Sequence, residues 1–209
     1  MTAPNLADSD RAQLVHLAMK TIARTGEATT RAALAKEARM PRARIDTIFA
    51  TDDALFDAIL EEWYAPDIAI MEEVIASDLP IRRKFYEFFA RRFLREQERY
   101  RKDPATFAVY CEIGTDKFEN VRGYIDLADH YLCELIAEAQ AEGYLKGLEV
   151  DTAMSIINQM VSCYLQPYLI AVVDDRLSEE KLGLIVGAIF DGLDSRDGGA
   201  RGTQDIRAA

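Results

Sequence analysis

Apolar residues recur every three or four positions along most of the chain, and this spacing constrains the fold more than any other feature. Leu14, Val15 and Ile22 line one face of a first helix that should end near Thr25. Strand-like alternation of apolar and polar residues is absent. With 209 residues, the chain can form one large domain, or a small domain plus a larger one. The sequence therefore predicts an all-α protein.

The first fifty residues divide into three short helices, whose ends are marked by residues with strong turn or capping preferences. Gly26 can end the first helix, and Thr29 or Thr30 can cap the second. Pro41 suits the first turn of a third helix, because the N–H that proline lacks has no helical partner there. Thr51 can cap a fourth helix, whose next two residues are aspartates that favour helix initiation.

The rest of the chain carries longer helices. We expect Pro66 to kink or split the fourth helix, since proline removes a hydrogen bond from the helix interior. A nearly all-apolar helix should run from about Asp151 to Val173, and Ser178 should cap the last one. Residues 195–209 contain mostly Gly, Arg, Asp and small side chains, which predicts a disordered tail.

Charge is distributed unevenly along the chain. The formal net charge is −11, yet eight basic residues are accompanied by only two acidic residues between Arg11 and Arg44. A basic end on an acidic body could approach phosphate with that end alone. Uneven charge in a short segment also arises by chance.

Three stretches carry a resemblance to a known family: AMKTIARTGEATT, LAKEARM and IDTIFATDDALFDAIL. With them, residues 11–60 resemble the N-terminal domain of the TetR family of transcriptional regulators. The resemblance implies a three-helix helix-turn-helix DNA-binding domain at residues 1–50. It further implies a larger helical bundle for ligand binding and dimerisation at residues 51–194, which matches the family only in helix number and length.

Several positions depart from the family pattern. Arg39 stands where the family has a turn glycine, and Asp46 and Asp52 replace a Tyr and a Lys that touch phosphate. A carboxylate near phosphate repels it. Arg31 replaces a usually apolar residue and could supply a new phosphate contact. Asp46 could accept a hydrogen bond from a cytosine amine, or it is a solvated or salt-bridged surface residue.

In helix-turn-helix proteins, the second helix of the motif enters the major groove with its N-terminal residues. The side chains that we expect to contact DNA are Thr29, Thr30, Arg31, Arg42, Arg44 and Thr47. The first three lie at the N-terminus of the preceding helix, which suits phosphate contact. For the arginines, ordinary solvation of a helix surface is the alternative.

The resemblance also implies an effector pocket enclosed by the helices of the body. Residues that could line it around a small apolar or aromatic effector are Phe89, Phe107, Tyr110, Cys111, Tyr131, Asn158 and Gln159. Aromatic residues at helical spacing equally suit a protein core. The two amides, which need partners if buried, could instead bind a backbone carbonyl or a dimer partner.

The last two helices are the most apolar of the chain and therefore need burial on several sides. A two-fold homodimer with a four-helix interface would provide it. The residues expected at this interface are Tyr164, Leu165, Tyr168, Leu169, Ile185 and Ile189. The resemblance implies the same dimer.

Nothing in the sequence indicates catalysis, because no nucleophile–base pair, metal-ligand cluster or glycine-rich phosphate loop is found. We expect no enzyme activity, cofactor or metal. Cys111, Cys133 and Cys163 are widely spaced and should be buried reduced thiols, which indicates a cytoplasmic protein. No uncharged apolar run reaches the length of a membrane span, so no membrane contact is expected.

Two functions remain open. The favoured one is a ligand-responsive DNA-binding transcriptional regulator, most simply a repressor that a small-molecule effector releases from its operator. The alternative is a TetR-like dimer with weakened or lost operator binding, acting as a ligand-binding or protein-interaction module. Asp46, Asp52 and the negative net charge motivate the alternative.

Overall fold

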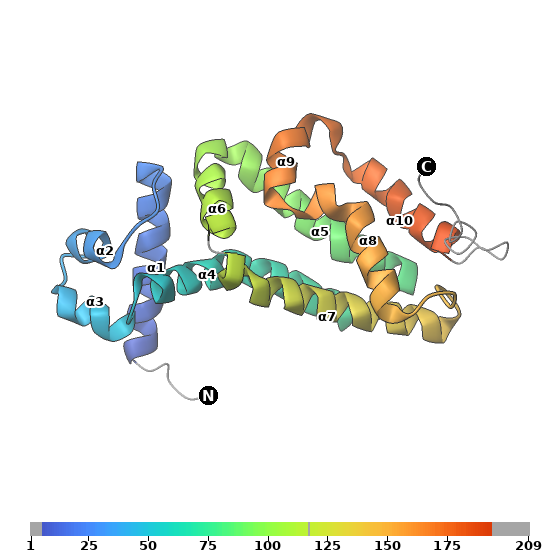
Figure 1. Cartoon of the computed structure of the whole chain (residues 1–209), viewed down its shortest axis with the longest axis horizontal. Helices are drawn as coiled ribbons and strands as arrows, with labels where there is room; N and C mark the ends of the chain where they lie inside the picture. The colour runs from blue at the N-terminus through green and yellow to red at the C-terminus, as the bar shows by residue number, and fades with distance from the viewer. Residues whose placement is uncertain (1–5, 117, 194–209) are drawn as a thin grey trace, which may run out of the picture. The chain divides into compact units, whose positions relative to one another are not determined.

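The computed structural model describes residues 6–116 and 118–193, and within these ranges the chain forms helices and no strand (Figure 1). In chain order, the α-helices are α1 (Leu6–Thr25), α2 (Arg31–Glu37), α3 (Arg42–Ile48), α4 (Asp52–Ile75), α5 (Ile81–Lys102), α6 (Pro104–Asp116), α7 (Phe118–Glu142), α8 (Val150–Leu165), α9 (Pro167–Val173) and α10 (Glu179–Leu193). A short 3-10 helix, Asp174–Arg176, precedes α10. The predicted all-α class is confirmed.

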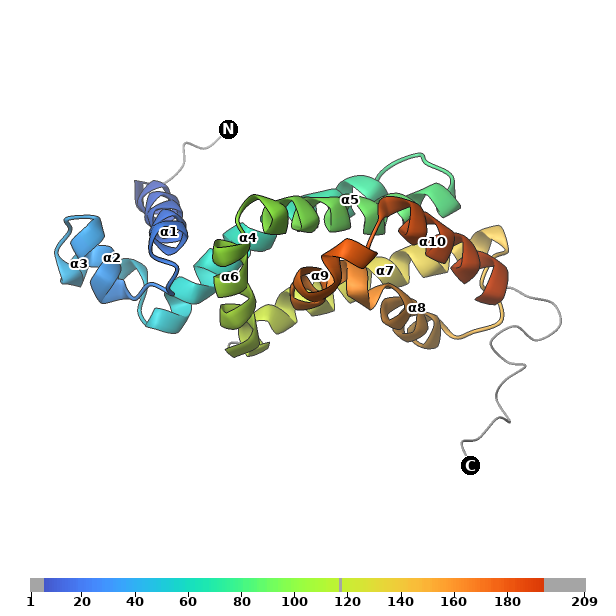
Figure 2. The same ribbon diagram turned by 90° about the horizontal axis from the view of Figure 1, so that it is seen from above.

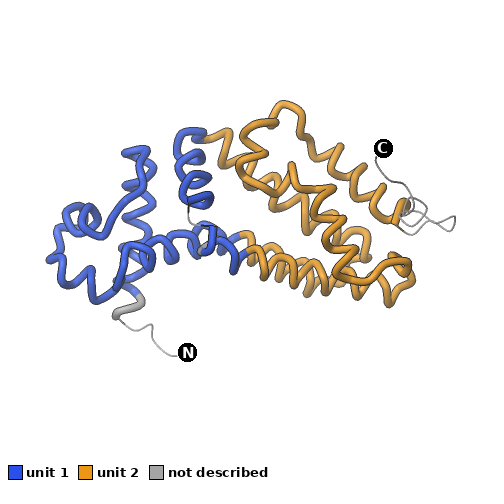
Figure 3. The backbone as a smooth tube through the Cα atoms, in the orientation of Figure 1, with its two compact units in different colours: residues 1–66, 103–124 blue, residues 67–102, 125–209 orange. Residues whose placement is uncertain are grey.

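The chain folds as two compact units (Figure 3). Unit 1 comprises residues 1–66 and 103–124, and unit 2 comprises residues 67–102 and 125–209. The division of the chain at residue 51 into a DNA-binding and an effector domain remains a prediction. The predicted disordered tail, residues 195–209, lies outside the described residues.

Capping side chains fix where α2 and α4 begin in unit 1. The Thr30 Oγ1 accepts a hydrogen bond from the N–H of Ala33 at 3.2 Å. The Thr51 Oγ1 accepts one from the N–H of Ala54 at 3.0 Å. Each bond satisfies a backbone donor that lacks a partner within its own helix. The predicted caps at Thr30 and Thr51 are therefore confirmed.

Pro66 does not split the fourth helix, so of the two predicted outcomes only a kink remains open. α4 continues from Asp52 to Ile75 with Pro66 inside it. Proline removes one hydrogen bond, but burial on both sides of Pro66 favours the helix. Trp63 is 8 % exposed and Met71 is fully buried, so the apolar stripe of α4 is anchored before and after the proline.

The expected single helix from 151 to 173 is two helices in the structure. α8 ends at Leu165 and α9 begins at Pro167, while Gln166 has an extended backbone with ψ of 117°. The ring of a proline disfavours helical geometry in the residue before it. In the described part of the chain, no single helix is long and apolar enough to cross a membrane. α8 and Pro167–Arg176, bent by 55°, meet that length and composition only as a pair.

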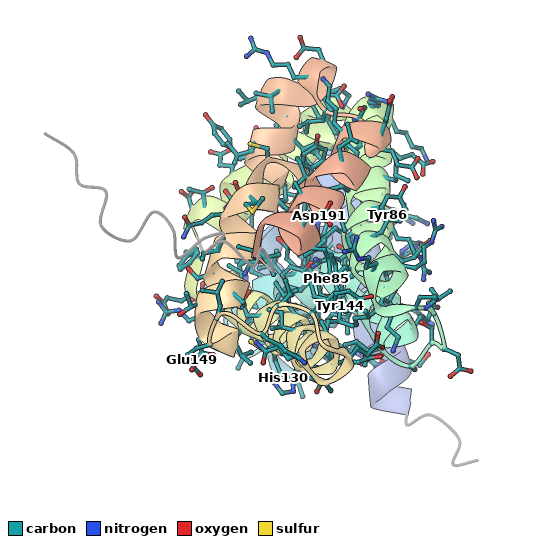
Figure 4. All side chains as sticks on the ribbon, turned by 90° about the vertical axis from the view of Figure 1, so that its right-hand side faces the viewer. Phe85, Tyr86, His130, Tyr144, Glu149 and Asp191 are labelled. Carbon is teal, nitrogen blue, oxygen red and sulfur yellow. The ribbon has the colours of Figure 1, made fainter. Side chains whose placement is uncertain are left out.

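α5 is central to unit 2 and packs against α8, α9 and α10 (Figure 2). Its buried phenylalanines are Phe85, Phe88, Phe89 and Phe93. Phe85 meets Phe190 of α10 edge to face with ring centroids 5.0 Å apart, and Phe93 meets Tyr164 of α8 in the same way at 4.9 Å. Figure 4 looks along this unit and shows Phe85 and Tyr144 among its helices. The core of unit 2 is therefore largely aromatic.

The turn between α2 and α3 contains a residue in the left-handed backbone region. Arg39 has φ of 52°, and its side chain is exposed. The N–H of Met40 closes this turn by donating to the carbonyl oxygen of Ala35 at 3.0 Å. A residue with a Cβ is strained in this region by about 1–2 kcal/mol. An arginine therefore occupies, at this turn, the left-handed backbone conformation that glycine adopts without strain.

Arg39→Gly should have a higher free energy of unfolding than Arg39→Ala by about 1 kcal/mol, because only glycine relieves the left-handed strain. Both variants lose the same guanidinium, so the difference between them isolates the backbone. Urea denaturation followed by circular dichroism measures it. Equal free energies of unfolding would contradict strain at this turn.

Candidate functional site

α3 is the second helix of the helix-turn-helix and presents charged side chains to solvent. Ile45 is fully buried and anchors the inner face of the helix. Arg42, Arg44 and Thr47 are exposed, and 42 % of the Arg42 side chain and 58 % of the Arg44 side chain are accessible. The side chains predicted to approach DNA from α3 are thus available at the surface of unit 1.

Arg31, the first residue of α2, is surrounded by acceptors from three other segments. Its backbone N–H and its Nε donate to the Asp52 Oδ1 at 2.8 and 3.1 Å. Its Nη1 donates to the Asp46 Oδ1 at 2.8 Å and to the carbonyl oxygens of Phe49 and Ala50 at 3.1 and 2.7 Å. Only 16 % of the side chain is exposed. Arg31 therefore joins α2 to α3, to the following turn and to the start of α4.

The two carboxylates at the family's phosphate-contact positions are partners of this arginine. The Asp46 Oδ1 also accepts a hydrogen bond from the Nε of Arg42 at 2.8 Å. Asp52 accepts the N–H of Arg31, a backbone donor at a helix N-terminus, and this bond together with the guanidinium lowers the pKa of Asp52. We call Arg31, Asp46, Asp52 and Arg42 the Arg31 cluster. It makes Asp46 a salt-bridged residue, one of the two interpretations that the sequence left open.

Other basic residues of the N-terminal segment are also paired with acids. The ion pairs beyond the Arg31 cluster join α1 to other helices of unit 1: Arg11 with Glu61, Arg24 with Glu37, and Arg44 with Asp10. Within the described residues, the basic side chains between 11 and 44 that make no ion pair are Lys20, Lys36 and Arg39. The positive potential of this surface is therefore weaker than a count of its basic residues suggests.

Two of the predicted phosphate contacts require correction. Thr29 is 3 % exposed, and its Oγ1 has no hydrogen-bond partner within the described residues, so this hydroxyl cannot reach phosphate without opening the core. The guanidinium of Arg31 is engaged by Asp46 and Asp52, and only 16 % of the side chain is exposed. Thr30 is exposed, but its Oγ1 is used as the cap of α2.

The predicted pocket residues of unit 1 gather around one indole. The ring of Trp63 stacks on Tyr110 with centroids 3.8 Å apart and lies 6.2 Å from the ring of Phe107. Phe107 is 1 % exposed and Tyr110 is 6 % exposed, while Cys111 is half-buried. These residues form an aromatic core for unit 1, the alternative that the helical spacing left open.

The predicted pocket residues of unit 2 have separate partners. Phe89 is fully buried beside Phe88. The hydroxyl of Tyr131 donates to the Glu72 Oε1 at 3.0 Å, and the Nδ2 of Asn158 donates to the Asp129 Oδ1 at 2.7 Å. Gln159 is exposed, so the single chain does not enclose this side chain, and its place in a pocket remains a prediction. The expectation of buried cysteines fails, because Cys163 is exposed and Cys111 and Cys133 are half-buried.

Sequence reasoning missed a charged cluster inside unit 2, formed by Asp67, Arg95, Glu96 and Arg99. The Arg95 Nη1 donates to the Asp67 Oδ1 and to the Glu96 Oε1, both at 2.9 Å, and the Arg99 Nη1 donates to the same Glu96 oxygen at 2.8 Å. Asp67 is 1 % exposed and Glu96 is 5 % exposed. We call these four residues the Glu96 cluster.

The Glu96 cluster contains an unsatisfied acceptor. The Glu96 Oε2 is buried and has no hydrogen-bond partner within the described residues. Burial raises the pKa of Glu96 to about 7 and also raises the pKa of Asp67, despite the nearby arginines. A buried polar atom without a partner is costly, so a ligand that donates a hydrogen bond there would be stabilised. The sequence did contain a signal for this buried carboxylate. Glu96 follows Phe93 by three positions and Phe85 by eleven, a helical spacing that places it close to the buried stripe of α5.

Several large apolar side chains are exposed on the last helices of unit 2, and we call this set the apolar surface. Its most exposed members are Met160 of α8, Tyr168 and Val172 of α9, and Leu184 of α10, at 40, 65, 58 and 69 % exposure. Two predicted interface residues do not belong to it. Tyr164 and Ile189 are 5 and 0 % exposed, because both point into the core of their own unit. The other predicted residues, Leu165, Leu169 and Ile185, are half-buried.

α1, α2 and α3, with arginines exposed on α3, have the arrangement of a helix-turn-helix. The model of the tetracyclin repressor-like C-terminal domain matches residues 82–186 of this chain. The chain therefore belongs to the TetR family of transcriptional regulators. No curated protein matches its sequence.

Solved structures of other regulators share the fold. The fatty acid degradation regulator FadR from Bacillus halodurans is 14 % identical, with a TM-score of 0.60 over 93 % of this chain and 100 % of that one. A TetR-family regulator from Mesorhizobium loti MAFF303099 is 11 % identical, with a TM-score of 0.65 over 91 and 97 %. FadR from Bacillus subtilis, solved with stearoyl-CoA, is 18 % identical, with a TM-score of 0.57 over 87 and 98 %.

Glu96 should make folding depend on pH. Its pKa is raised from 4.5 to about 7 in the folded protein, so its stabilising contribution is complete below pH 4.5 and is lost as pH rises through 7. Between pH 5 and pH 8 the wild type should lose on the order of 1–3 kcal/mol of unfolding free energy that Glu96→Gln retains. Urea denaturation at both pH values measures this loss.

The exposed neighbour Glu98 provides a matched control, because Glu98→Gln changes the same functional group on the outer side of α5. This variant should keep the pH dependence of the wild type. If Glu96→Gln also kept it, the titration of a buried Glu96 would be contradicted.

Proposed function

We propose that the chain is a ligand-responsive transcriptional regulator that binds a double-stranded DNA operator through α3. Its simplest form is a cytoplasmic repressor that a small-molecule effector releases. Membership of the TetR family supports this function. The observation that carries it is the exposure of Arg42, Arg44 and Thr47 on α3, because the N-terminal residues of such a helix reach base edges.

The weakened positive surface favours a second candidate function. Asp10, Asp46 and Asp52 neutralise arginines that a typical operator-binding surface would offer to phosphates. This neutralisation of positive charge is consistent with a dimer that binds ligands or proteins and has little affinity for DNA. Operator binding remains our first proposal, since the outer edge of the Arg42 guanidinium stays accessible and the side chains of Arg44 and Thr47 are exposed.

We also propose that the chain acts as a homodimer through the apolar surface of α8, α9 and α10. Met160, Tyr168, Val172 and Leu184 are large side chains that remain accessible to water in the single chain. Burying them against a second copy would be favourable by about 25 cal/mol for each Å² removed from water. A two-fold axis would bring the same residues of both chains together.

Leu184→Glu should convert the dimer into a monomer, because it places two carboxylates in the proposed interface. Leu184 is 69 % exposed, so the folded monomer should tolerate the change. Size-exclusion chromatography with light scattering measures the mass. Leu79→Glu, at a leucine that is 39 % exposed before α5, is the matched control and should remain dimeric. A dimeric Leu184→Glu variant would contradict this interface.

The Glu96 cluster supports a small-molecule effector in unit 2. The Glu96 Oε2 lacks a hydrogen-bond partner, and the aromatic side chains of α5 lie on the same helix. An effector with an apolar body and one hydrogen-bond donor would complement these groups. The B. subtilis FadR structure contains stearoyl-CoA, which makes this molecule a reasonable first probe for the present chain.

Fluorescence anisotropy on the DNA upstream of the protein's own gene tests the proposed function. The wild type should bind this duplex at least tenfold more tightly than a scrambled duplex at physiological salt. Addition of stearoyl-CoA should weaken specific binding if an acyl thioester is the effector. Equal and weak binding to both duplexes, followed by failure to enrich any sequence from a random pool, would favour the second candidate function.

A further inference from the structure

We propose that Arg42 reads a guanine in each operator half-site and that Asp46 holds it in the geometry this requires. The proposal rests on the proposed operator binding and goes beyond it by naming a base and the residues that select it. It concerns the first turn of α3, where recognition helices contact base edges. Arg42 is the first residue of α3, and 42 % of its side chain is exposed.

The hydrogen bonds of Arg42 leave one edge of its guanidinium available. Its Nε donates to the Asp46 Oδ1 at 2.8 Å. Within the described residues, no hydrogen bond is recorded from its Nη1 or Nη2. These two nitrogens form the outer edge of a planar fork. Such an edge matches the O6 and N7 acceptors of guanine in the major groove.

Asp46 is itself fixed in place. Its Oδ1 also accepts the Nη1 of Arg31 at 2.8 Å, and Arg31 is anchored to Asp52 and to the carbonyl oxygens of Phe49 and Ala50. A continuous set of hydrogen bonds therefore runs from the start of α4 through Arg31 and Asp46 to Arg42. A pre-oriented arginine loses less rotamer entropy when it binds a base, which favours specific recognition. Asp46 is a positioning residue in this arrangement.

The neighbouring Arg44 is bound differently and should not read guanine in this way. Its Nη2 donates to the Asp10 Oδ2 of α1, so the outer edge of its guanidinium is already engaged. The Arg44 side chain is 58 % exposed, so its charge remains suitable for a phosphate, which contributes affinity without sequence preference. Arg44 is therefore a matched control on the same helix, with the same charge and comparable exposure.

Selection of duplexes from a random pool with the full-length chain, followed by binding measurements on single-base variants, tests the proposal. The wild type should enrich a half-site with a guanine whose replacement by adenine weakens binding roughly 5- to 100-fold. In Arg42→Ala, replacing this guanine by adenine should change the affinity by about onefold, so the preference is lost. The base preferences at all other positions should remain. Arg44→Ala should bind all duplexes more weakly while keeping the discrimination.

Two further variants examine the positioning role of Asp46. Asp46→Asn should reduce the discrimination for guanine several-fold while keeping the thermal midpoint near that of the wild type, since Asp46 is 41 % exposed. Arg42→Lys should retain only part of the preference, because an ammonium lacks the planar fork. These readouts separate loss of base recognition from loss of folding.

The proposal would be overturned if Arg42→Ala kept every base preference of the wild type. It would also be overturned if Arg42→Ala lost affinity uniformly across all duplexes, as expected for a phosphate contact. Failure of the wild type to enrich any sequence would instead reject operator binding, and this inference with it. An Asp46→Asn variant with unchanged discrimination would refute the positioning role alone.

Discussion

The arrangement of unit 1 depends on the charge of one largely buried arginine. Arg31 occupies a position that is usually apolar in the family, and a guanidinium there must find acceptors because desolvation of an unpaired charge is expensive. Asp52, Asp46 and two backbone carbonyl oxygens supply them. The arginine at position 31 and the carboxylates at positions 46 and 52 therefore depend on one another. The carboxylates that look misplaced for DNA binding are partners of the arginine next to them.

The same interaction has consequences for recognition. By binding Asp46, Arg31 prevents this carboxylate from acting as an isolated negative charge beside α3, and it also fixes the partner of Arg42. α4 carries an acid held by an arginine in each unit, Asp52 in unit 1 and Asp67 in unit 2. Under the proposed function, a change in α4 near Asp52 would be felt at α3 through the hydrogen bonds of Arg31 and Asp46.

The sequence predicted the helices of this chain well, because helical periodicity and capping residues are local signals. Thr30 and Thr51 were identified as caps for this reason. The break at Gln166 was missed, and Pro66 was left open between a kink and a split, since the outcome at a proline depends on the burial of flanking residues such as Trp63. The role of Arg31 could not be predicted, because its partners lie 15 and 21 positions away and only the fold brings them together. Glu96 was missed because a charged residue on an amphipathic helix is usually assigned to the solvated face.

The salt dependence of DNA binding by Arg31→Met tests most directly whether Arg31 binds carboxylates in place of phosphate. Each phosphate contact adds about 0.9 to the slope of log K against log salt concentration. If Arg31 acts inside the protein, the variant should bind a selected duplex more weakly with the same slope as the wild type. A slope that is less steep by about 0.9, with an unchanged thermal midpoint, would contradict the internal role and return Arg31 to the DNA surface.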